Sequence, residues 1–229
     1  MRKRVLIISL LAIVVMGGYA QTYDYRVGIK LGPSFNWASS GSTATKNEGV
    51  RLGFNAGLVI DRYFTDNISV SSGLNFNFMS MKYQFEDARS EFFLNEVQLP
   101  VERRVKATVL EVPLKAKVGL EVMESVRAYV EAGGSLGFNL KDKVKDKYKY
   151  FNYSYEDATY VDRTEQYRLL QASIVFGLGA EYQINRNFSV FAQLTFNHGL
   201  MNAYSKEVEN KTGSILNTNF IGIEMGGVF

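Results

Sequence analysis

The chain has 229 residues, of which 46% are hydrophobic, with twenty glycines, three prolines and no cysteine. The lack of cysteine excludes disulfides, thiolate metal sites and cysteine nucleophiles. The formal net charge of +3 comes from three basic residues near the start, and the chain after residue 20 carries 23 basic and 23 acidic side chains. That balance gives no reason to expect a nucleic-acid partner.

The first twenty residues have the three parts of a secretory signal peptide. Basic residues at positions 2–4 precede an apolar run over 5–16, and small residues end at Ala20. The run is too short and wrongly flanked for a spanning helix. We expect cleavage to remove residues 1–20 and leave one domain over 21–229, with a retained amphipathic anchor as the alternative.

Alternation of apolar and polar residues then recurs in eight segments. They run over 27–37, 50–61, 68–78, 110–120, 127–140, 171–183, 188–197 and 221–229. One face of each segment is apolar, and the other is dominated by Gly, Ser, Asn and Gln with a few charges of both signs. A period of two predicts a β-strand in each case.

Strands of this kind occur in soluble β-sandwiches and in membrane barrels. A sandwich turns its polar face to water, whereas small polar residues suit the narrow lumen of a closed barrel. Short connections at 63–67, 122–126 and 185–187 alternate with long ones, as in outer-membrane barrels. The sequence therefore predicts an all-β fold: an eight-stranded antiparallel, up-and-down transmembrane barrel of the outer membrane, surrounded by its lipids, with both termini periplasmic.

The chain ends on an alternating segment, NFIGIEMGGVF, whose last residue is Phe229. In a barrel the last strand pairs with the first, and its apolar side chains face lipid. Phe229 is expected at the periplasmic interface, where aromatic rings are favoured.

Three stretches carry a family resemblance: RVGIKLGPSFNW, GFNAGLVIDRYFTDNISVSSGLNF and LEVPLKAKVGL. They are similar to the PorT-like outer-membrane β-barrel family of Bacteroidetes, and residues 110–115 are the most specific part. The resemblance implies eight strands. Because the family includes the PorT and PorG accessory barrels of type IX secretion, it also implies partners among other secretion proteins. It further implies that Phe229 acts as an assembly signal. The long third outer loop departs from the family pattern.

Charged residues on the polar faces are expected to project into the lumen. They are Arg51, Glu111, Lys115, Lys117, Arg127, Glu131, Glu181 and Glu224. We expect a structural ion network, because an unpaired buried charge is costly; a proton path or ligand site is the alternative. Pro113 removes one ladder donor and predicts a bulge near Glu111.

No residue is assigned to catalysis, to a cofactor or to a metal, because the sequence lacks a P-loop, a dinucleotide fingerprint and zinc-ligand spacing. His198, the sole histidine, is expected at the outer end of the seventh strand. Its sequence neighbours supply no nucleophile or carboxylate to pair with it, which disfavours a lipid-acting enzyme at the rim.

The third outer loop, 141–167, is rich in tyrosine, and lysines occupy alternate positions from 141 to 149. The pattern predicts a basic-faced ribbon above the membrane, with Tyr148 and Tyr150 on its other side. Tyrosine-rich loops suit protein contacts, so a surface adhesin or receptor is one hypothesis.

The favoured hypothesis is a non-catalytic accessory or scaffold component of a secretion machine of the type IX kind. Such a barrel would act by contact and not as a pore, because side chains fill an eight-stranded lumen. Candidate contacts for periplasmic lipoproteins lie at the short turns: Arg62, Tyr63, Asp66 and Arg186.

Overall fold

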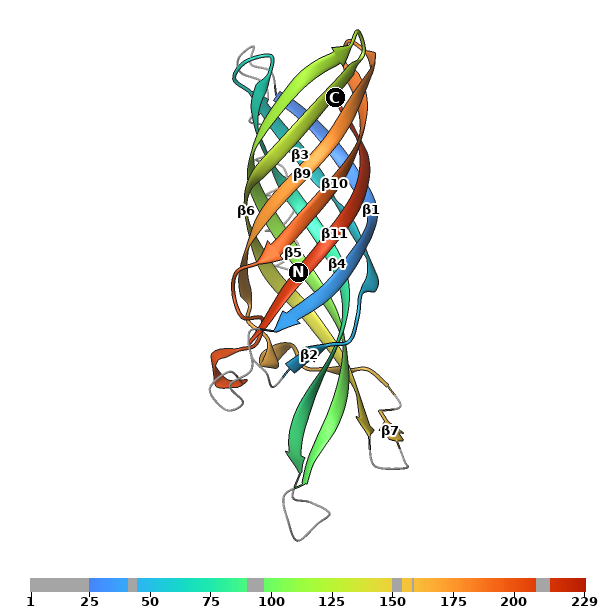
Figure 1. Cartoon of the computed structure of the whole chain (residues 1–229). Coiled ribbons are helices and arrows are strands. Elements are labelled where there is room, and N and C mark those ends of the chain that lie inside the picture. The colour runs from blue at the N-terminus through green and yellow to red at the C-terminus, as the bar shows by residue number, and fades with distance from the viewer. Residues whose placement is uncertain (1–24, 41–44, 90–96, 150–153, 158, 209–214) are drawn as a thin grey trace, which may run out of the picture.

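The protein is a closed barrel of eight antiparallel strands in a computed structural model, which describes residues 25–40, 45–89, 97–149, 154–157, 159–208 and 215–229 (Figure 1). The barrel strands are β1 (Tyr25–Ser40), β3 (Arg51–Tyr63), β4 (Ile68–Arg89), β5 (Val97–Met123), β6 (Val126–Lys149), β9 (Leu170–Asn185), β10 (Phe188–Gly199) and β11 (Leu216–Val228). The predicted fold class is confirmed. The expected signal peptide, 1–20, lies outside the described residues.

Smaller elements lie at the end of the barrel that carries the long connections. They are the strands β2 (Thr45–Asn47), β7 (Ser154–Glu156) and β8 (Val161–Asp162) and the 3-10 turn η2 (Thr164–Gln166). β2 pairs with β4, and both β7 and β8 pair with β6. Among the described residues, no helix is long and apolar enough to cross a membrane.

Pairing between β1 and β11 closes the barrel. The register runs from Gly28 opposite Val228 to Ser40 opposite Leu216. A path of paired residues that leaves β1 at Asn36 and goes once around the barrel returns to β1 at Arg26, ten residues away. A stagger of this kind requires strands that are tilted to the barrel axis, as Figure 1 shows.

Phe229 continues the closing ladder. Its N–H donates to the Val27 carbonyl at 2.8 Å, and the Val27 N–H donates to the Phe229 carbonyl at 3.1 Å. Its ring lies 4.9 Å from that of Phe188 at the end of the barrel with the short turns. Short turns face the periplasm in outer-membrane barrels, so this end is the periplasmic end.

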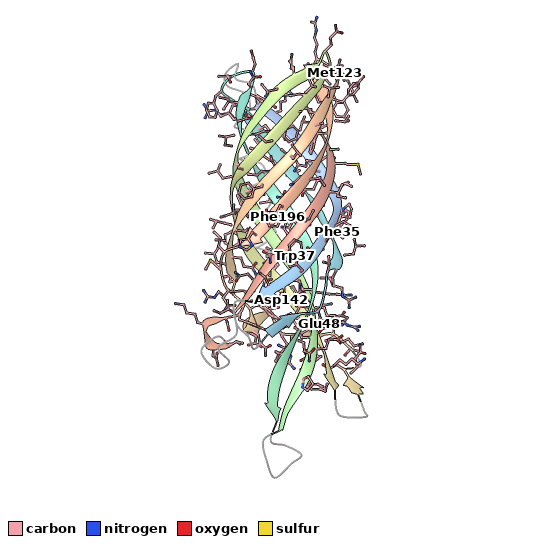
Figure 2. All side chains as sticks on the ribbon, viewed as in Figure 1. Phe35, Trp37, Glu48, Met123, Asp142 and Phe196 are labelled. Carbon is pink, nitrogen blue, oxygen red and sulfur yellow. The ribbon has the colours of Figure 1, made fainter. Side chains whose placement is uncertain are left out.

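Apolar side chains form the outer surface of the middle of the barrel. Val27, Ile29 and Leu31 on β1 are each half exposed or more, while Gly28 and Lys30 between them point inward and are buried. Aromatic residues gather at the outer boundary of this band, where Trp37 stacks on Phe196 with 6.3 Å between ring centres (Figure 2). The band is the lipid-facing surface, and the aromatic residues mark its outer interface.

Beyond the aromatic boundary, the two faces of the long strands exchange their chemistry. On β4 the inward Asn77 is followed by the inward Met79, and the outward Phe78 is followed by the outward Ser80. Water replaces lipid at this height, so apolar side chains turn inward and polar ones turn outward. β4, β5 and β6 therefore continue as strands through segments that the sequence pattern assigned to loops, and those predicted loops were too long.

A bulge on β6 sets the direction of its lysines. Thr108 pairs with Lys141 and Val109 with Asn139, so Leu140 is an extra residue on this strand. The extra residue exchanges the faces of β6, which places Lys141 outside and Asp142 inside. The predicted basic-faced ribbon is present, with Tyr148 buried on its other side; Tyr150 lies outside the described residues.

A bulge lies two residues from Glu111, at the register shift between Thr108 and Val109, but Pro113 does not cause it. Glu111 pairs with Asn75 on one side and Gly137 on the other, in a register that continues past Pro113. The Pro113 carbonyl still accepts a hydrogen bond from the Ser72 hydroxyl at 2.8 Å. Proline thus removes one donor without displacing the strand.

A core of buried side chains closes the outer end of the barrel. They include Met79, Met81, Tyr83, Val105, Val144, Tyr167, Tyr204, Leu216 and Phe220. The Tyr83 hydroxyl lies 2.8 Å from that of Tyr167 and 2.7 Å from that of Tyr204. Arg103 and Asp146 form a two-pronged ion pair beside it, with both N–O distances 2.7 Å. We refer to these residues as the outer core.

The reversal of the two faces predicts how lysine substitutions depend on height. Leu114 faces lipid in the middle of the band, so Leu114→Lys should destabilise the folded barrel by about 2–4 kcal/mol. Gln84→Lys, on an outward position above the band, should have little effect. Urea titration in phospholipid vesicles measures both, and equal losses for the two variants would contradict the assignment of the band.

Asp142 gives a pH prediction. It is buried above the aromatic boundary beside the Asn139 amide, and burial raises the pKa of its carboxyl from 3.8 to about 7. The Asp142 carboxyl loses its proton near pH 4 in the unfolded chain but near pH 7 in the folded barrel. The free energy of unfolding therefore falls as the pH rises between these two values. Asp142→Asn should therefore stabilise the barrel at pH 8 and have little effect at pH 4. One pKa unit corresponds to about 1.4 kcal/mol.

The measurement is urea titration of wild type and variant at both pH values. Asp162→Asn is the control, because Asp162 is exposed and the Thr164 hydroxyl and amide lower its pKa. An Asp142→Asn effect of the same size at pH 4 and pH 8 would show that burial of the charge is not its origin.

Candidate functional site in the lumen and at the periplasmic mouth

Ion pairs between strands occupy the lumen. Three lysines each meet a carboxylate: Lys30 and Glu224 at 2.9 Å, Lys115 and Glu131 at 2.5 Å, and Lys117 and Asp61 at 2.7 Å. All six residues are at most 5% exposed. A buried charge of this kind needs a partner, because each ion has lost its water. We call these six residues the lumen network.

Small residues make room for the network. Gly177 lies directly opposite Glu131 in the sheet, and a Cβ atom there would lie 2.4 Å from Cγ of Glu131. Thr195 and Gln193 occupy the remaining space beside Glu224 and donate to its Oε2 at 3.0 Å and 2.6 Å. The Gly, Ser, Asn and Gln of the polar faces thus leave space for the charged side chains and hydrogen-bond to them.

Glu111 is held differently from the other acids. Its carboxylate accepts hydrogen bonds from the amides of Asn75, Asn77 and Asn197 at 3.5, 3.0 and 3.1 Å. Lys115 follows Glu111 on the same face of β5 but pairs with Glu131 instead. The sequence predicted that Glu111 is an inward charge but could not predict that amides surround it.

Six of the eight charges expected to point inward are buried in the lumen: Glu111, Lys115, Lys117, Glu131, Glu181 and Glu224. Arg127 lies at the periplasmic mouth and Arg51 at the outer end of β3, and both are half-buried and join none of the described ion pairs. The list omitted Lys30, Asp61 and Arg26. Alternation alone would have found Lys30 and Asp61, because both occupy polar-face positions of their strands.

The packed lumen leaves little room for water. A cavity beside Glu111 and Met79 has a volume of about 20 Å³, which is about the space of a single water molecule. The outer core lies above it and the lumen network below it. The described residues therefore provide no wide aqueous path along the barrel axis.

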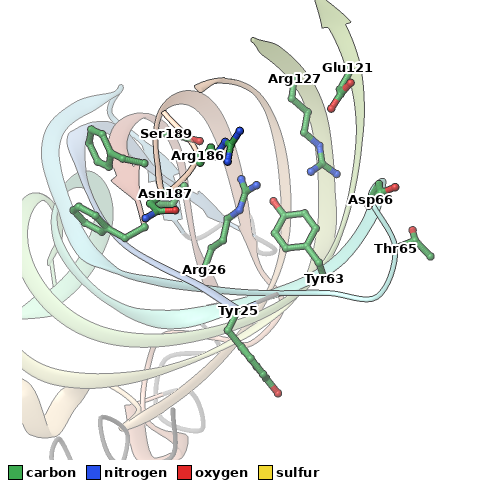
Figure 3. Close-up of a pocket in the computed structure, with 13 residues that line it drawn as sticks. Tyr25, Arg26, Tyr63, Thr65, Asp66, Glu121, Arg127, Arg186, Asn187 and Ser189 are labelled. Carbon is green, nitrogen blue, oxygen red and sulfur yellow. The ribbon is translucent and has the colours of Figure 1, made fainter. Parts of the chain in front are cut away.

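The periplasmic mouth, in contrast, opens into a cavity of about 410 Å³ (Figure 3). Its charged lining comprises Arg26, Asp66, Glu121, Arg127 and Arg186, and the Tyr63 ring lies among them. These residues come from β1, β3, the β3–β4 turn, β5, β6 and the β9–β10 turn. The cavity thus brings together segments that are far apart in the sequence.

Two guanidinium groups lie over the ring of Tyr63. The Cζ atoms of Arg26 and Arg127 are each 5.0 Å from the ring centre, within the range of a cation–π contact. Arg26 also pairs with Glu181 at 2.5 Å. Gly119 makes room for Arg127, since a Cβ atom there would lie 2.3 Å from Arg127 Nε.

Several donors at the mouth have no acceptor among the described residues. They are Nε and Nη2 of Arg127 and the hydroxyl of Tyr63, all buried. A buried donor without an acceptor is costly, and carboxylates and phosphates are the acceptors that guanidinium groups bind best. The geometry suits an anionic group that enters from the periplasm.

The predicted contact residues fall into two groups. Tyr63, Asp66 and Arg186 line the cavity, although Tyr63 is buried and faces inward. Arg62 faces outward, and its Cζ lies 5.6 Å from the Tyr25 ring and 5.2 Å from the Phe64 ring. A cation among aromatic rings suits anchoring at the membrane interface.

His198 lies at the outer end of β10. Its Nδ1 is 2.6 Å from Oδ1 of Asn219, and its ring stacks on Phe196 at 6.4 Å. An amide and an aromatic ring do not activate a nucleophile. Within the described ranges, no group of three or more His, Asp or Glu side chains is arranged to hold a metal ion.

The closed, tilted barrel, its apolar band and its filled polar lumen define an integral outer-membrane β-barrel. The chain belongs to the family described as the outer membrane protein beta-barrel domain, which it matches over residues 19–205. This match shows the general family and not the narrower PorT-like one. No curated protein matches the chain in sequence.

Several solved outer-membrane proteins are similar to the chain. Neisserial surface protein A shares 10% identity, with 90% of this chain and 98% of that protein covered and a TM-score of 0.46. The outer membrane protease OmpT from Escherichia coli shares 13% identity, with 92% and 99% covered and a TM-score of 0.46. The outer membrane protein OprG from Pseudomonas aeruginosa shares 13%, with 90% and 97% covered and a TM-score of 0.40.

The lumen network predicts a double-mutant result. Glu131→Leu leaves Lys115 buried without its partner and should destabilise the barrel by about 3–5 kcal/mol. Replacing both residues with leucine should cost less than the single change, because no uncompensated charge remains. Glu111→Gln is the control, since the amide keeps the shape of the site and should cost about 1 kcal/mol.

Urea titration of the four proteins in the same detergent provides the comparison. A double variant that is less stable than Glu131→Leu would mean that the lysine stabilises the lumen by packing and not by its charge.

Proposed function

We propose that this protein is a non-catalytic accessory or scaffold component of an outer-membrane protein machine, and that it binds a periplasmic partner through the mouth of the barrel. The observation that carries the proposal is the set of buried, unsatisfied donors of Arg127 and Tyr63 around a cavity of about 410 Å³. A secretion machine of the type IX kind is the one that the sequence resemblance suggests.

The state of the lumen supports action by contact. A transporter needs a path, but the lumen network fills the middle of this barrel and the outer core fills its outer end. The mouth cavity is wide enough for one side chain or a small head group and ends at Arg26, Tyr63 and Arg127. The cavity is therefore suited to bind one side chain or head group of a partner.

The partner's contact group is expected to be acidic. Arg26 is already neutralised by Glu181, whereas Nε and Nη2 of Arg127 have no acceptor among the described residues. Arg186, on the β9–β10 turn, is exposed and lines the same cavity. A carboxylate of a periplasmic protein or lipoprotein would accept from Arg127 Nε and Nη2 together, which is the two-pronged geometry that guanidinium favours. The rim acids Asp66 and Glu121 would repel a second acidic group and so restrict the orientation of the partner.

The three tyrosines of the third outer loop whose side chains the structure describes give less support to a surface receptor. Tyr148 and Tyr167 are 7% and 6% exposed, because they belong to the outer end's buried packing. Tyr160 lies beneath Lys106, whose Nζ is 4.6 Å from the centre of its ring. These side chains stabilise the barrel's own structure and offer little area to another protein.

The test is quantitative co-purification from the native host in mild detergent. Arg127→Gln should reduce the periplasmic lipoproteins or secretion components that accompany the tagged barrel by at least about tenfold, because a charge-assisted pair is worth about 1.5–3 kcal/mol. Arg62→Gln is the matched control, since it removes the same charge from the same end but on the lipid-facing side.

A second variant tests whether the partner binds at the outer end of the barrel instead of the periplasmic end. Replacing residues 151–159 with a short glycine–serine linker spares Asp142, Val144 and Tyr167 and should leave the partner bound. If this replacement releases the partner and Arg127→Gln does not, the protein acts through its outer surface as a binding module. If neither variant changes what co-purifies, the mouth is not the contact site.

A further inference from the structure

A second hollow lies on the outside of the barrel, just above its lipid-facing band. β3 pairs with β4 only as far as Phe54 opposite Phe78, and β2 begins its pairing with β4 at Tyr83. Between these points β4 remains bonded to β5 on its other side. The strand edge facing β3 is thus uncovered by any described strand over a short stretch, and the wall is notched there.

The notch opens into a groove that crosses four strands. Its volume is about 510 Å³, and its main side chains are Leu52, Phe54, Phe78, Lys106, Lys141 and Lys143. The sheet register explains why the two kinds of residue meet. Phe78 lies beside Thr108 and Lys141 in one row, and Ser80 lies beside Lys106 and Lys143 in the next row outward.

The groove is therefore apolar on its membrane side and basic on its water side. Leu52, Phe54 and Phe78 are 66%, 43% and 46% exposed, and they belong to the outermost part of the lipid-facing band. The three lysines are exposed and stand directly above that part. A ligand in the groove would span the boundary between hydrocarbon and water.

The lysines of the groove have too few acids nearby. Other cations at this end have close partners, with Lys82 3.0 Å from Glu102 and Lys145 2.9 Å from Glu156. In contrast, Lys106 and Lys143 face each other directly across the β5–β6 ladder, an arrangement that is destabilising between like charges.

One exposed acid, Asp162, interacts with the two lysines of β6. Asp162 Oδ2 is 3.8 Å from Lys141 Nζ, and the charges of both Lys141 and Lys143 act on this carboxyl. Lys106 lies over the Tyr160 ring, and the part of the chain that the structure describes places no carboxylate in an ion pair with it. Among the described residues, three cations thus share a single solvated acid, so a bound anion would relieve their repulsion.

We propose that this groove binds a phosphorylated lipid of the outer leaflet, with its acyl chains along Leu52, Phe54 and Phe78 and a phosphate among Lys106, Lys141 and Lys143. Basic clusters at the membrane boundary attract anionic head groups, and each lysine near the surface adds to the affinity. A soluble anion would leave the apolar half of the groove unused, and a purely apolar lipid would leave the lysines uncompensated. A phosphorylated lipid satisfies both halves.

The test uses the whole folded barrel in a non-ionic detergent, titrated with diphosphorylated, hexa-acylated lipid A and followed by native mass spectrometry. We expect one tightly bound lipid per barrel. Lys106→Gln combined with Lys143→Gln should weaken binding at least about tenfold. The matched control is Arg163→Gln combined with Lys206→Gln, which removes two cations at the same end of the barrel but outside the groove and should bind like wild type. Heat-modifiable gel migration shows that each variant is folded.

Two further probes test the two halves of the groove. Dephosphorylated lipid A should lose most of the affinity, and so should the deacylated, phosphorylated sugar head group. The proposal is overturned if dephosphorylated lipid A binds as well as the intact lipid, if the soluble head group alone binds equally tightly, or if the control pair weakens binding as much as the groove pair. The groove and the mouth lie at opposite ends, so failure here leaves the co-purification result at Arg127 unaffected.

Discussion

Hydrocarbon offers a backbone amide no hydrogen-bond partner except another strand, and the rest of this structure depends on that constraint. It is met by closing β1 onto β11, down to the bonds between Val27 and Phe229. A ring of eight strands is narrow, so side chains must fill it. The strands place charges in that space, and each charge then needs a partner from another strand, as Lys30 finds in Glu224 and Lys115 in Glu131.

The same strands pass from lipid into water, and their chemistry changes with the solvent. Below the aromatic boundary the apolar side chains face out; above it they face in and form the outer core. The Leu140 bulge adapts β6 to this change by turning its lysines outward. Because the reversal occurs at the same height on neighbouring strands, a row of lysines stands directly above a row of aromatic and aliphatic side chains. The lipid groove is thus a consequence of the solvent boundary.

The two ends of the barrel have opposite properties, and this asymmetry is the basis for the proposed role. The outer end is sealed by Tyr83, Tyr167 and Tyr204, and the Tyr83 hydroxyl bonds to the hydroxyls of the other two. The periplasmic end is open, and the donors of Arg127 and Tyr63 face a cavity without described acceptors. A barrel that is closed at its outer end and has donors without described acceptors at its periplasmic end is suited to holding a partner and not to passing a solute.

The sequence by itself determined the number of barrel strands, the face that each turns to lipid, and the outer-membrane location, because a period of two is a local property and the composition of each face reports its solvent. It also identified most of the inward charges, such as Glu131 and Glu224. Only the tertiary structure decided which charges meet. Lys115 pairs with Glu131 while amides surround Glu111, and Arg127 joins Arg26 over the Tyr63 ring. These contacts depend on the stagger between neighbouring strands, which the pattern of a single strand does not contain.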